Sequence, residues 1–248
     1  MADPIHQFKI EPLVPLGGEV HLDFTNSAFY MVLSVGITAA LMLGATASRR
    51  IVPSRIQSVA ELAYEFVADT IRNTIGEGGM KFFPLVFSLF MFILVSNVVG
   101  LIPYQFTVMS HIIVTAALAL LVFFTVIIYG FWKNGLHFFN LFVPKGIPIY
   151  ILPLIVFIEV LSFLSRPISH SVRLFANMLA GHITLQVFAG FIILMGTGLG
   201  AIGWAASLLP FALVVILFAL ETLVAFLQAY VFAILTCIYL NDAIHPGH

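Results

Sequence analysis

The chain has 248 residues, of which 61% are apolar and only 8% are charged, and its formal net charge is −1. A typical soluble domain is about 45–50% apolar and about 25% charged. The composition therefore excludes a soluble enzyme, a disordered protein and, for want of a basic surface, a nucleic-acid binder. The single cysteine, Cys237, excludes a disulfide framework and a cysteine-based metal site. With a mean hydropathy of +1.12, the chain is predicted to be an integral membrane protein.

Residues 1–24 precede the first apolar run and mix charged residues with prolines. No basic stretch leads into an apolar one there, as it would in a secretory signal peptide. We interpret residues 1–24 as a polar N-terminal tail outside the bilayer.

The spacing of charged residues maps the membrane spans, because a spanning helix needs about 20 mostly apolar residues. The long runs without Asp, Glu, Lys or Arg hold 25, 51, 47 and 20 residues. Gly100 and Pro103 interrupt the 51-residue run, and proline disfavours a continuous helix, so we predict two spans there joined by a turn. We expect one membrane domain over 25–248, an all-α fold of five to six helices. Its predicted spans are residues 26–48, 82–103, 106–132, 147–165, 166–200 and 204–240.

Residues 54–75 are amphipathic. Ser54 and Gln57 fit a capping box, which predicts that a helix begins there. One face of that helix is apolar and another is acidic. The apolar face holds Ile56, Val59, Ala63, Phe66, Val67 and Ile71, and the acidic face holds Glu61, Glu65 and Asp69. We read this as a helix lying in the membrane interface, the alternative being a connector helix packed on its own chain.

The basic residues predict the orientation of the chain. The loops after the first and third spans carry seven of them, and the N-terminal tail carries only Lys9. The seven are Arg49, Arg50, Arg55, Arg72, Lys81, Lys133 and Lys145. Positively charged loops tend to stay on the cytoplasmic side. We therefore expect the N-terminus outside and, if each long C-terminal segment crosses once, the C-terminus in the cytoplasm.

Arg173 stands inside apolar sequence, where a charge costs at least about 2.5–3.5 kcal/mol at mid-bilayer. Its guanidinium stays protonated at any biological pH. The residues three and four positions away include no acid; they are Ser169, His170, Ala176 and Asn177. Either Arg173 reaches an interface, or a carboxylate from elsewhere approaches it, the option that we favour. The small residues around Asn177 would let another helix come close, although they would equally suit packing within this chain.

A second group of polar residues lies away from Arg173. His182 follows it by nine residues, about half a turn out of phase, and Gln186 shares the face of His182. Glu221 and Gln228 share a face of the next long segment. The two stripes could line a narrow wet path and relay protons, because histidine titrates near neutral pH. The alternative for His182 is a hydrogen-bonded core residue.

Glu159 and Arg166 are seven residues apart and would lie on nearly the same face of a helix. They could form an internal ion pair. Alternatively, Glu159 belongs to a second wet path, with Ser162 on the neighbouring turn.

The stretch from Ser171 to His182 reads SVRLFANMLAGH, and its pattern Arg-Leu-Phe-x-Asn-Met-x-Ala-Gly resembles the signature of subunit a of F-type ATP synthase. The positions of Glu159, Glu221 and Gln228 extend the resemblance, which covers most of the chain from the first span to Leu240.

The resemblance implies a non-catalytic, proton-conducting stator that lies beside a ring of c subunits and assembles with b-type subunits of the peripheral stalk. Arg173 would face the ring, with Asn177 on the same side, and would separate two offset half-channels. Proton flow through them would drive rotation and ATP synthesis. The outer path would hold His182, Glu221 and Gln228, with Gln186 as a further candidate. The inner path would hold Glu159, with Ser162 as a further candidate.

The resemblance also implies a pair of long, strongly tilted C-terminal helices. We expect neither a cofactor nor a metal. His182 together with Glu221 is similar to the alphaproteobacterial and mitochondrial arrangement, which places the chain in a bacterial or mitochondrial inner membrane. Two other classes are weighed against this one. The first is a solitary secondary transporter with helices broken near Gly196–Gly203. The second is an intramembrane enzyme or haem protein that uses His170, His182 and Glu221.

Overall fold

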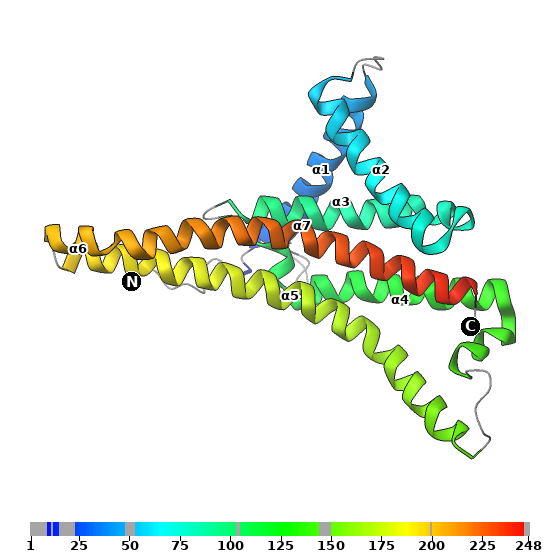
Figure 1. Ribbon diagram of the computed structural model, residues 1–248. Coiled ribbons are helices and arrows are strands. Elements are labelled where there is room, and N and C mark those ends of the chain that lie inside the picture. Colours follow the sequence, from blue (N-terminus) through cyan, green and yellow to red (C-terminus); the bar gives the residue numbers. More distant parts are fainter. Residues whose placement is uncertain are drawn as a thin grey trace. The chain divides into compact units, whose positions relative to one another are not determined.

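The computed structural model describes residues 9–10, 12–14, 23–47, 53–102, 105–143, 150–198 and 200–245. It is almost entirely helical, as the sequence predicts (Figure 1). The elements are β1 (Pro12–Val14), β2 (Phe24–Thr25), α1 (Asn26–Ala47), α2 (Arg55–Ile75), the 3-10 helix η2 (Glu77–Phe82), α3 (Phe83–Gly100), the 3-10 helix η3 (Val108–Ser110), α4 (Ile112–Asn134), the 3-10 helix η4 (Gly135–Phe142), α5 (Leu152–Gly198), α6 (Gly200–Ala206) and α7 (Leu208–Ile244). The strands β1 and β2 form a short antiparallel pair that the sequence analysis did not predict.

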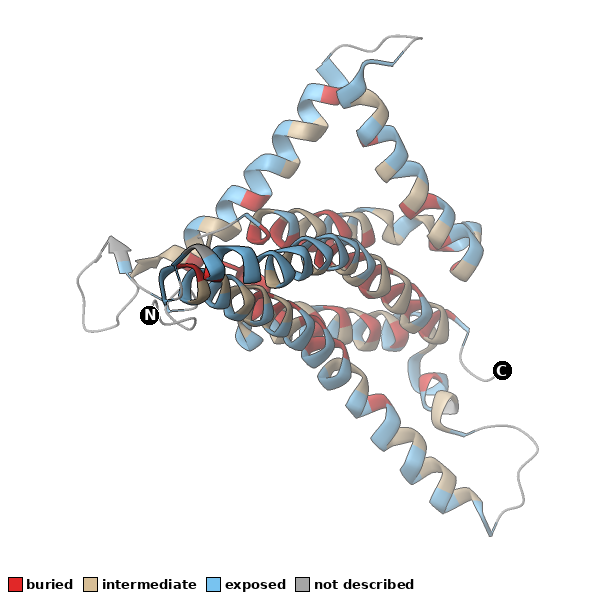
Figure 2. Ribbon diagram, turned by 60° about the vertical axis from the view of Figure 1, so that its left-hand side comes forward, coloured by how far each residue is buried: buried red, intermediate tan, exposed pale blue. Residues whose placement is uncertain are grey.

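Five helical stretches of the described chain are long and apolar enough to cross a membrane, which confirms the all-α membrane fold. They are Asn26–Ala47, Glu77–Gly100, Ile112–Phe139, Leu152–Gly198 and Ile202–Ile244. Most of α1 is exposed in Figure 2, whereas the stretch that ends in α3 is the most enclosed of the five.

The helix α5 runs unbroken through Pro167 and through the boundary predicted between the spans 147–165 and 166–200. A proline inside a helix removes one backbone hydrogen bond. In an apolar segment, every other backbone group still has to be satisfied internally, so the helix continues. At 1.5 Å per residue, its 47 residues extend about 70 Å, more than twice the hydrocarbon thickness of a bilayer. The long C-terminal helices are thus confirmed, while their tilt in a membrane stays a prediction.

The contacts within the chain divide it into two compact units. Unit 1 comprises Met1–Ala40, Phe92–His111 and Leu174–Ala229, and unit 2 comprises Leu41–Met91, Ile112–Arg173 and Tyr230–His248. Because α1, α3, α5 and α7 each contribute to both units, neither unit is a continuous segment. The single membrane domain expected over 25–248 stays a prediction.

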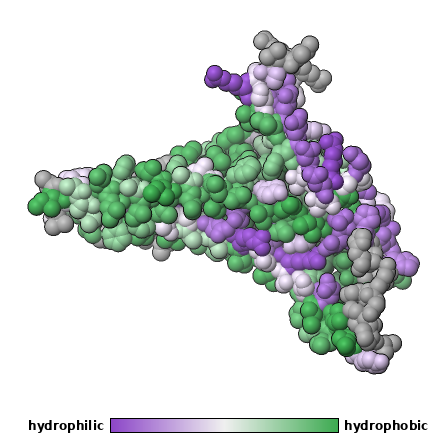
Figure 3. Space-filling model, in the orientation of Figure 1, coloured by the Kyte–Doolittle hydropathy of each residue, from purple (hydrophilic) through white to green (hydrophobic). Residues whose placement is uncertain are grey.

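In unit 1, the second half of α5 and the first half of α7 run side by side, with α6 between them in the chain (Figure 1). Gly200 begins α6 with φ +59°, a conformation that glycine adopts without a steric penalty. The surface over this hairpin is largely hydrophobic in Figure 3, as a lipid-facing surface should be. The buried side of the hairpin includes Leu174, Met178 and Ala225.

In unit 2, α2 begins as predicted but only half of the capping box forms. The Ser54 hydroxyl accepts a hydrogen bond from the Gln57 amide at 3.3 Å. The Gln57 side chain points forward instead and donates to Glu61 at 2.8 Å. The second half of α2 packs on its own chain, with Val67 and Ile71 buried. Its first half exposes apolar residues beside a hydrophilic surface (Figure 3), which suits the membrane interface.

The end of α7 is held by α4 in unit 2. The Lys133 ammonium donates to the carbonyl of Ile244 at 3.1 Å, and the Asn134 amide donates to that of Ala243 at 2.7 Å. The last carbonyls of a helix have no partner within the helix, so these side chains supply one. Cys237 lies one to two turns earlier on α7 and is fully buried.

Substitution of Gly130 by alanine tests the packing of unit 2. A Cβ at Gly130 would collide with the buried ring of Phe138, and overpacking of this kind costs about 1–3 kcal/mol. We expect Gly130→Ala to lower the thermal unfolding temperature of the purified protein. Gly36→Ala is the matched control, because a Cβ on α1 meets nothing within 4 Å there. Equal unfolding temperatures for the two variants would contradict the packing described.

Candidate functional site

The helices α5 and α7 bring His182 and Glu221 into direct contact within unit 1. Nδ1 of His182 hydrogen-bonds Oε1 of Glu221. Both side chains are buried, with 6% and 4% of their surfaces exposed. The sequence predicted that the two residues lie on polar stripes of neighbouring helices, and the structure shows that the stripes touch.

The backbone of α3 fixes the orientation of the His182 ring. Nε2 of His182 lies 2.9 Å from the carbonyl oxygen of Gly100. A carbonyl can only accept, so Nε2 must carry a hydrogen and donate. Nδ1 then faces Glu221: it accepts a hydrogen bond if the carboxyl group is protonated, and it donates one if the ring is doubly protonated.

Gly181 makes room for the Glu221 carboxyl group. A Cβ at Gly181 would lie 2.7 Å from Oε1 and 3.0 Å from Cδ of Glu221. Contacts under 3.0 Å require something to move, so a glycine at this position lets the two helices and the carboxyl group fit together.

Asn97 of α3 joins the same part of unit 1. Its side-chain amide donates to the carbonyl of Ala225 at 3.2 Å, one turn after Glu221 on α7. Gln228 follows on α7, half-buried. Together with Gly100, Asn97 makes α3 a third wall of the site, which the analysis of α5 and α7 alone did not predict.

Several buried polar atoms of unit 1 have no hydrogen-bond partner within the described residues. They are Ser96 Oγ, Asn97 Oδ1, Thr107 Oγ1, Ser110 Oγ, His111 Nε2, Gln186 Oε1 and Glu221 Oε2. Buried polar groups are nearly always hydrogen-bonded, to protein or to ordered water. Each of these atoms is therefore a candidate to bind an ordered water molecule.

Arg173 is exposed on α5 and forms no ion pair or hydrogen bond with any described residue of this chain. Ala176, Asn177 and Ala180, on the following turns, are exposed as well. No acid of the described chain pairs with the guanidinium, and the exposed side chains on the next turns of the helix are small. This surface can accept a carboxylate carried by another molecule.

The ion pair weighed between Glu159 and Arg166 does not form. The Arg166 guanidinium instead donates to Asp242 of α7 at 2.8 Å. It also lies over the rings of Phe163 and Tyr239, 5.4 and 4.9 Å from their centres. Spacing on one helix could not reveal a partner 76 positions away in sequence. Glu159 is half-buried and Ser162 exposed on the first half of α5.

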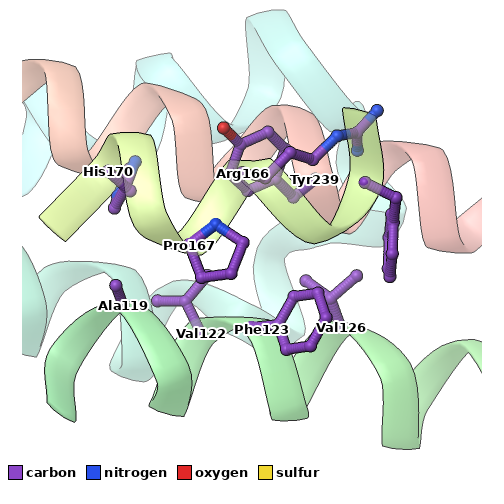
Figure 4. A pocket seen from close by; sticks show the side chains of 9 residues that line it. Ala119, Val122, Phe123, Val126, Arg166, Pro167, His170 and Tyr239 are labelled. Carbon is purple, nitrogen blue, oxygen red and sulfur yellow. The ribbon is translucent and has the colours of Figure 1, made fainter. Parts of the chain in front are cut away.

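A small cavity lies beside Arg166 in unit 2 (Figure 4). Its volume of about 10 Å³ leaves room for about one water molecule. Pro167, His170 and Tyr239 line it, and Nε2 of His170 is buried without a hydrogen-bond partner among the described residues. The cavity is too small for a cofactor. In the described part of the chain, no cluster of three or more His, Cys, Asp or Glu residues could hold a metal ion.

The fold and these sites define a multi-spanning membrane protein that carries titratable groups inside its spans. The model of the family described as ATP synthase A chain matches residues 28–241. The chain therefore belongs to this family.

Three relatives are each named ATP synthase subunit a. Those from Bradyrhizobium diazoefficiens, Nitrobacter winogradskyi and a strain of Rhodopseudomonas palustris are all 68% identical to this chain. The first alignment covers 99% of both sequences, and the other two cover 100% of both.

Substitution of Gly181 by alanine tests the geometry of the His182–Glu221 pair. The added methyl group would displace the Glu221 carboxyl group, and a shift of about 1 Å in a reacting group can reduce a rate roughly 100-fold. We expect Gly181→Ala to reduce ATP synthesis by the reconstituted complex at least about tenfold. Gly190→Ala on the same helix should not, because a Cβ there meets nothing within 4 Å. Unchanged synthesis in Gly181→Ala would show that the pair tolerates displacement.

Proposed function

We propose that this chain conducts protons through the membrane sector of an ATP synthase along two offset half-channels that Arg173 keeps apart. Membership of the family supports the general role, that of a non-catalytic, proton-translocating subunit of the ATP synthase. The observation that carries the finer proposal is the contrast on α5 between a buried, paired His182 and an exposed Arg173 with no acid partner in the described chain.

The outer path runs through unit 1. His182 and Glu221 pass a proton between Nδ1 and Oε1, while the Gly100 carbonyl holds the ring in place. Gln186 and Gln228 lie about one and two turns further along their helices and offer amides to bound water. The N-terminus lies outside, as the distribution of basic residues predicts.

Arg173 faces a ring of c subunits, each with a carboxylate at mid-membrane. A ring carboxylate takes a proton from the outer path and, once neutral, can face lipid at low cost. After nearly one turn it releases the proton to the inner path, and the resulting anion pairs with Arg173. Because a guanidinium does not give up its own proton, Arg173 also blocks leakage between the two paths. The exposed Ala176, Asn177 and Ala180 allow the ring helix to approach.

The inner path begins at Glu159 and Ser162, which belong to unit 2. The ion pair of Arg166 with Asp242 supports this assignment, because it neutralises Arg166 without Glu159. Glu159 has no ion-pair partner among the described residues, so its carboxyl group is not committed to Arg166. Along α5, Arg173 stands between Glu159 and His182, as a barrier between two paths should.

The driving force is the proton-motive force, and each proton contributes about 2.3 kcal/mol per 100 mV. The chain itself makes and breaks no covalent bond besides those to transferred protons. It works as a single membrane domain together with the c ring and peripheral-stalk subunits of b type. Because the relatives named above come from bacteria, we assign the chain to a bacterial inner membrane.

Removal of the Arg173 charge tests the separation of the paths. We expect Arg173→Ala to abolish ATP synthesis driven by a proton gradient in reconstituted liposomes, because the deprotonated ring carboxylate loses its counter-ion. The complex should still assemble, since Arg173 has no partner within the described chain. Arg55→Ala, an exposed arginine of α2, serves as the control and should retain synthesis. Normal synthesis by Arg173→Ala would refute the proposal.

Neutralisation of Glu221 tests the outer path. Glu221→Gln keeps the shape of the side chain but cannot exchange a proton with His182. General acid–base groups contribute roughly 10²–10⁴-fold, so passive proton flow through the membrane sector should fall at least about tenfold without loss of membrane insertion. Glu65→Gln on the exposed face of α2 is the matched control. Should proton flow through Glu221→Gln equal that of the control, Glu221 plays no part in conduction.

A further inference from the structure

The outer path needs a group that takes protons from water, and the buried His182–Glu221 pair cannot do so directly. We propose that His111 is this group and that it passes protons along the turn Thr107–His111 toward His182. The inference rests on the proposed outer path and adds to it a residue and a route that neither α5 nor α7 contains.

The position of His111 suits a residue at the mouth of a path. It lies between η3 and α4, just outside the candidate spans that end at Gly100 and begin at Ile112. The residue is partly exposed, yet its Nε2 atom is buried and has no hydrogen-bond partner among the described residues. The exposed part of the ring can contact water, while the buried Nε2 atom is available to a group inside the protein.

The ring of His111 is held in place by stacking. It lies nearly parallel to the Phe106 ring, with the ring centres 4.8 Å apart and an angle of 12° between the planes. Phe106 stacks in turn on Tyr30 of α1, whose hydroxyl group hydrogen-bonds the side chain of Gln105. The stack orients the imidazole without using either of its nitrogen atoms.

A continuous set of contacts leads from His111 to His182. The turn is closed by hydrogen bonds from the amide of Ser110 to the carbonyl of Thr107 and from that of His111 to Val108, both 3.3 Å long. Thr107 packs against Gly100, where its Oγ1 would lie 3.4 Å from an added Cβ. The Gly100 carbonyl then accepts the hydrogen bond of His182. All of these residues belong to unit 1.

Two hydroxyl groups of this turn, Thr107 Oγ1 and Ser110 Oγ, are buried and have no hydrogen-bond partner within the described residues. A hydroxyl group both donates and accepts, so water bound between these atoms forms a chain that can carry a proton. The unsatisfied Oε2 of Glu221 offers an acceptor at the inner end.

The chemistry at His111 is a proton relay without net change. The neutral imidazole gains one proton from the outer water and loses one to an internal water molecule, so its charge returns to zero in each cycle. Burial lowers the pKa of His111, which keeps the ring neutral and able to accept at neutral pH. The titratable groups on the elements around this route are Tyr30 of α1, His182 of α5 and Glu221 of α7.

The test uses the complete ATP synthase in liposomes, with ATP synthesis driven by a potassium diffusion potential at equal pH on both sides. His111→Phe keeps the stack on Phe106 but has no nitrogen, and His111→Gln keeps a hydrogen-bonding group that cannot carry a proton. We expect both variants to assemble and to synthesise ATP at least about tenfold more slowly, within the range for acid–base groups.

Chemical rescue separates a relay from a structural role. His111→Ala opens a space beside Phe106, so millimolar imidazole added outside should restore much of the lost synthesis. Imidazole should not change the rate of the wild type or of His245→Ala, a control at the exposed end of α7. A wild-type rate in His111→Gln, or no recovery of His111→Ala with imidazole, would overturn the proposal.

The Glu221→Gln variant in the same assay distinguishes this inference from the function on which it rests. If Glu221→Gln retains ATP synthesis, the outer path itself is wrong. If Glu221→Gln loses synthesis while His111→Phe does not, the outer path stands and protons reach it without His111.

Discussion

The structure depends on one constraint, that a charge inside a bilayer needs a partner. This chain meets the constraint in two ways. His182 hydrogen-bonds Glu221 and the carbonyl of Gly100 inside unit 1. Arg166 has its own anion, Asp242, in unit 2. Arg173 has no such partner within the described chain, and this is why we propose that a carboxylate of another subunit pairs with it.

Much of the fold could be predicted because membrane insertion leaves a strong mark on sequence. The gaps between charged residues located the spans, since each spanning helix must exclude charge over about 20 residues. The predicted boundary between the spans 147–165 and 166–200 falls inside α5, an apolar helix that runs on through Pro167. There, the loss of one hydrogen bond costs less than the exposure of several.

The sequence predicted which residues form the site, but not which of them contact one another. Helical periodicity indicated that His182 and Glu221 face a polar path, yet no local pattern can report a contact across 39 positions. The partner of Arg166 was missed for the same reason. Gly100 contributes a backbone carbonyl group, and every residue has one, so the sequence could not indicate this contact. At Gly181 the sequence shows only a small residue. A small residue there is equally consistent with close packing between helices, so it did not indicate the space needed by the Glu221 carboxyl group.

The burial of Cys237 has a practical consequence. Its thiol group is the only one in the chain and lies wholly inside the protein, out of reach of aqueous reagents. A thiol introduced at any surface position would therefore react alone with a maleimide or a spin label, without prior removal of the native one. The natural sequence is already a background for site-specific spectroscopy.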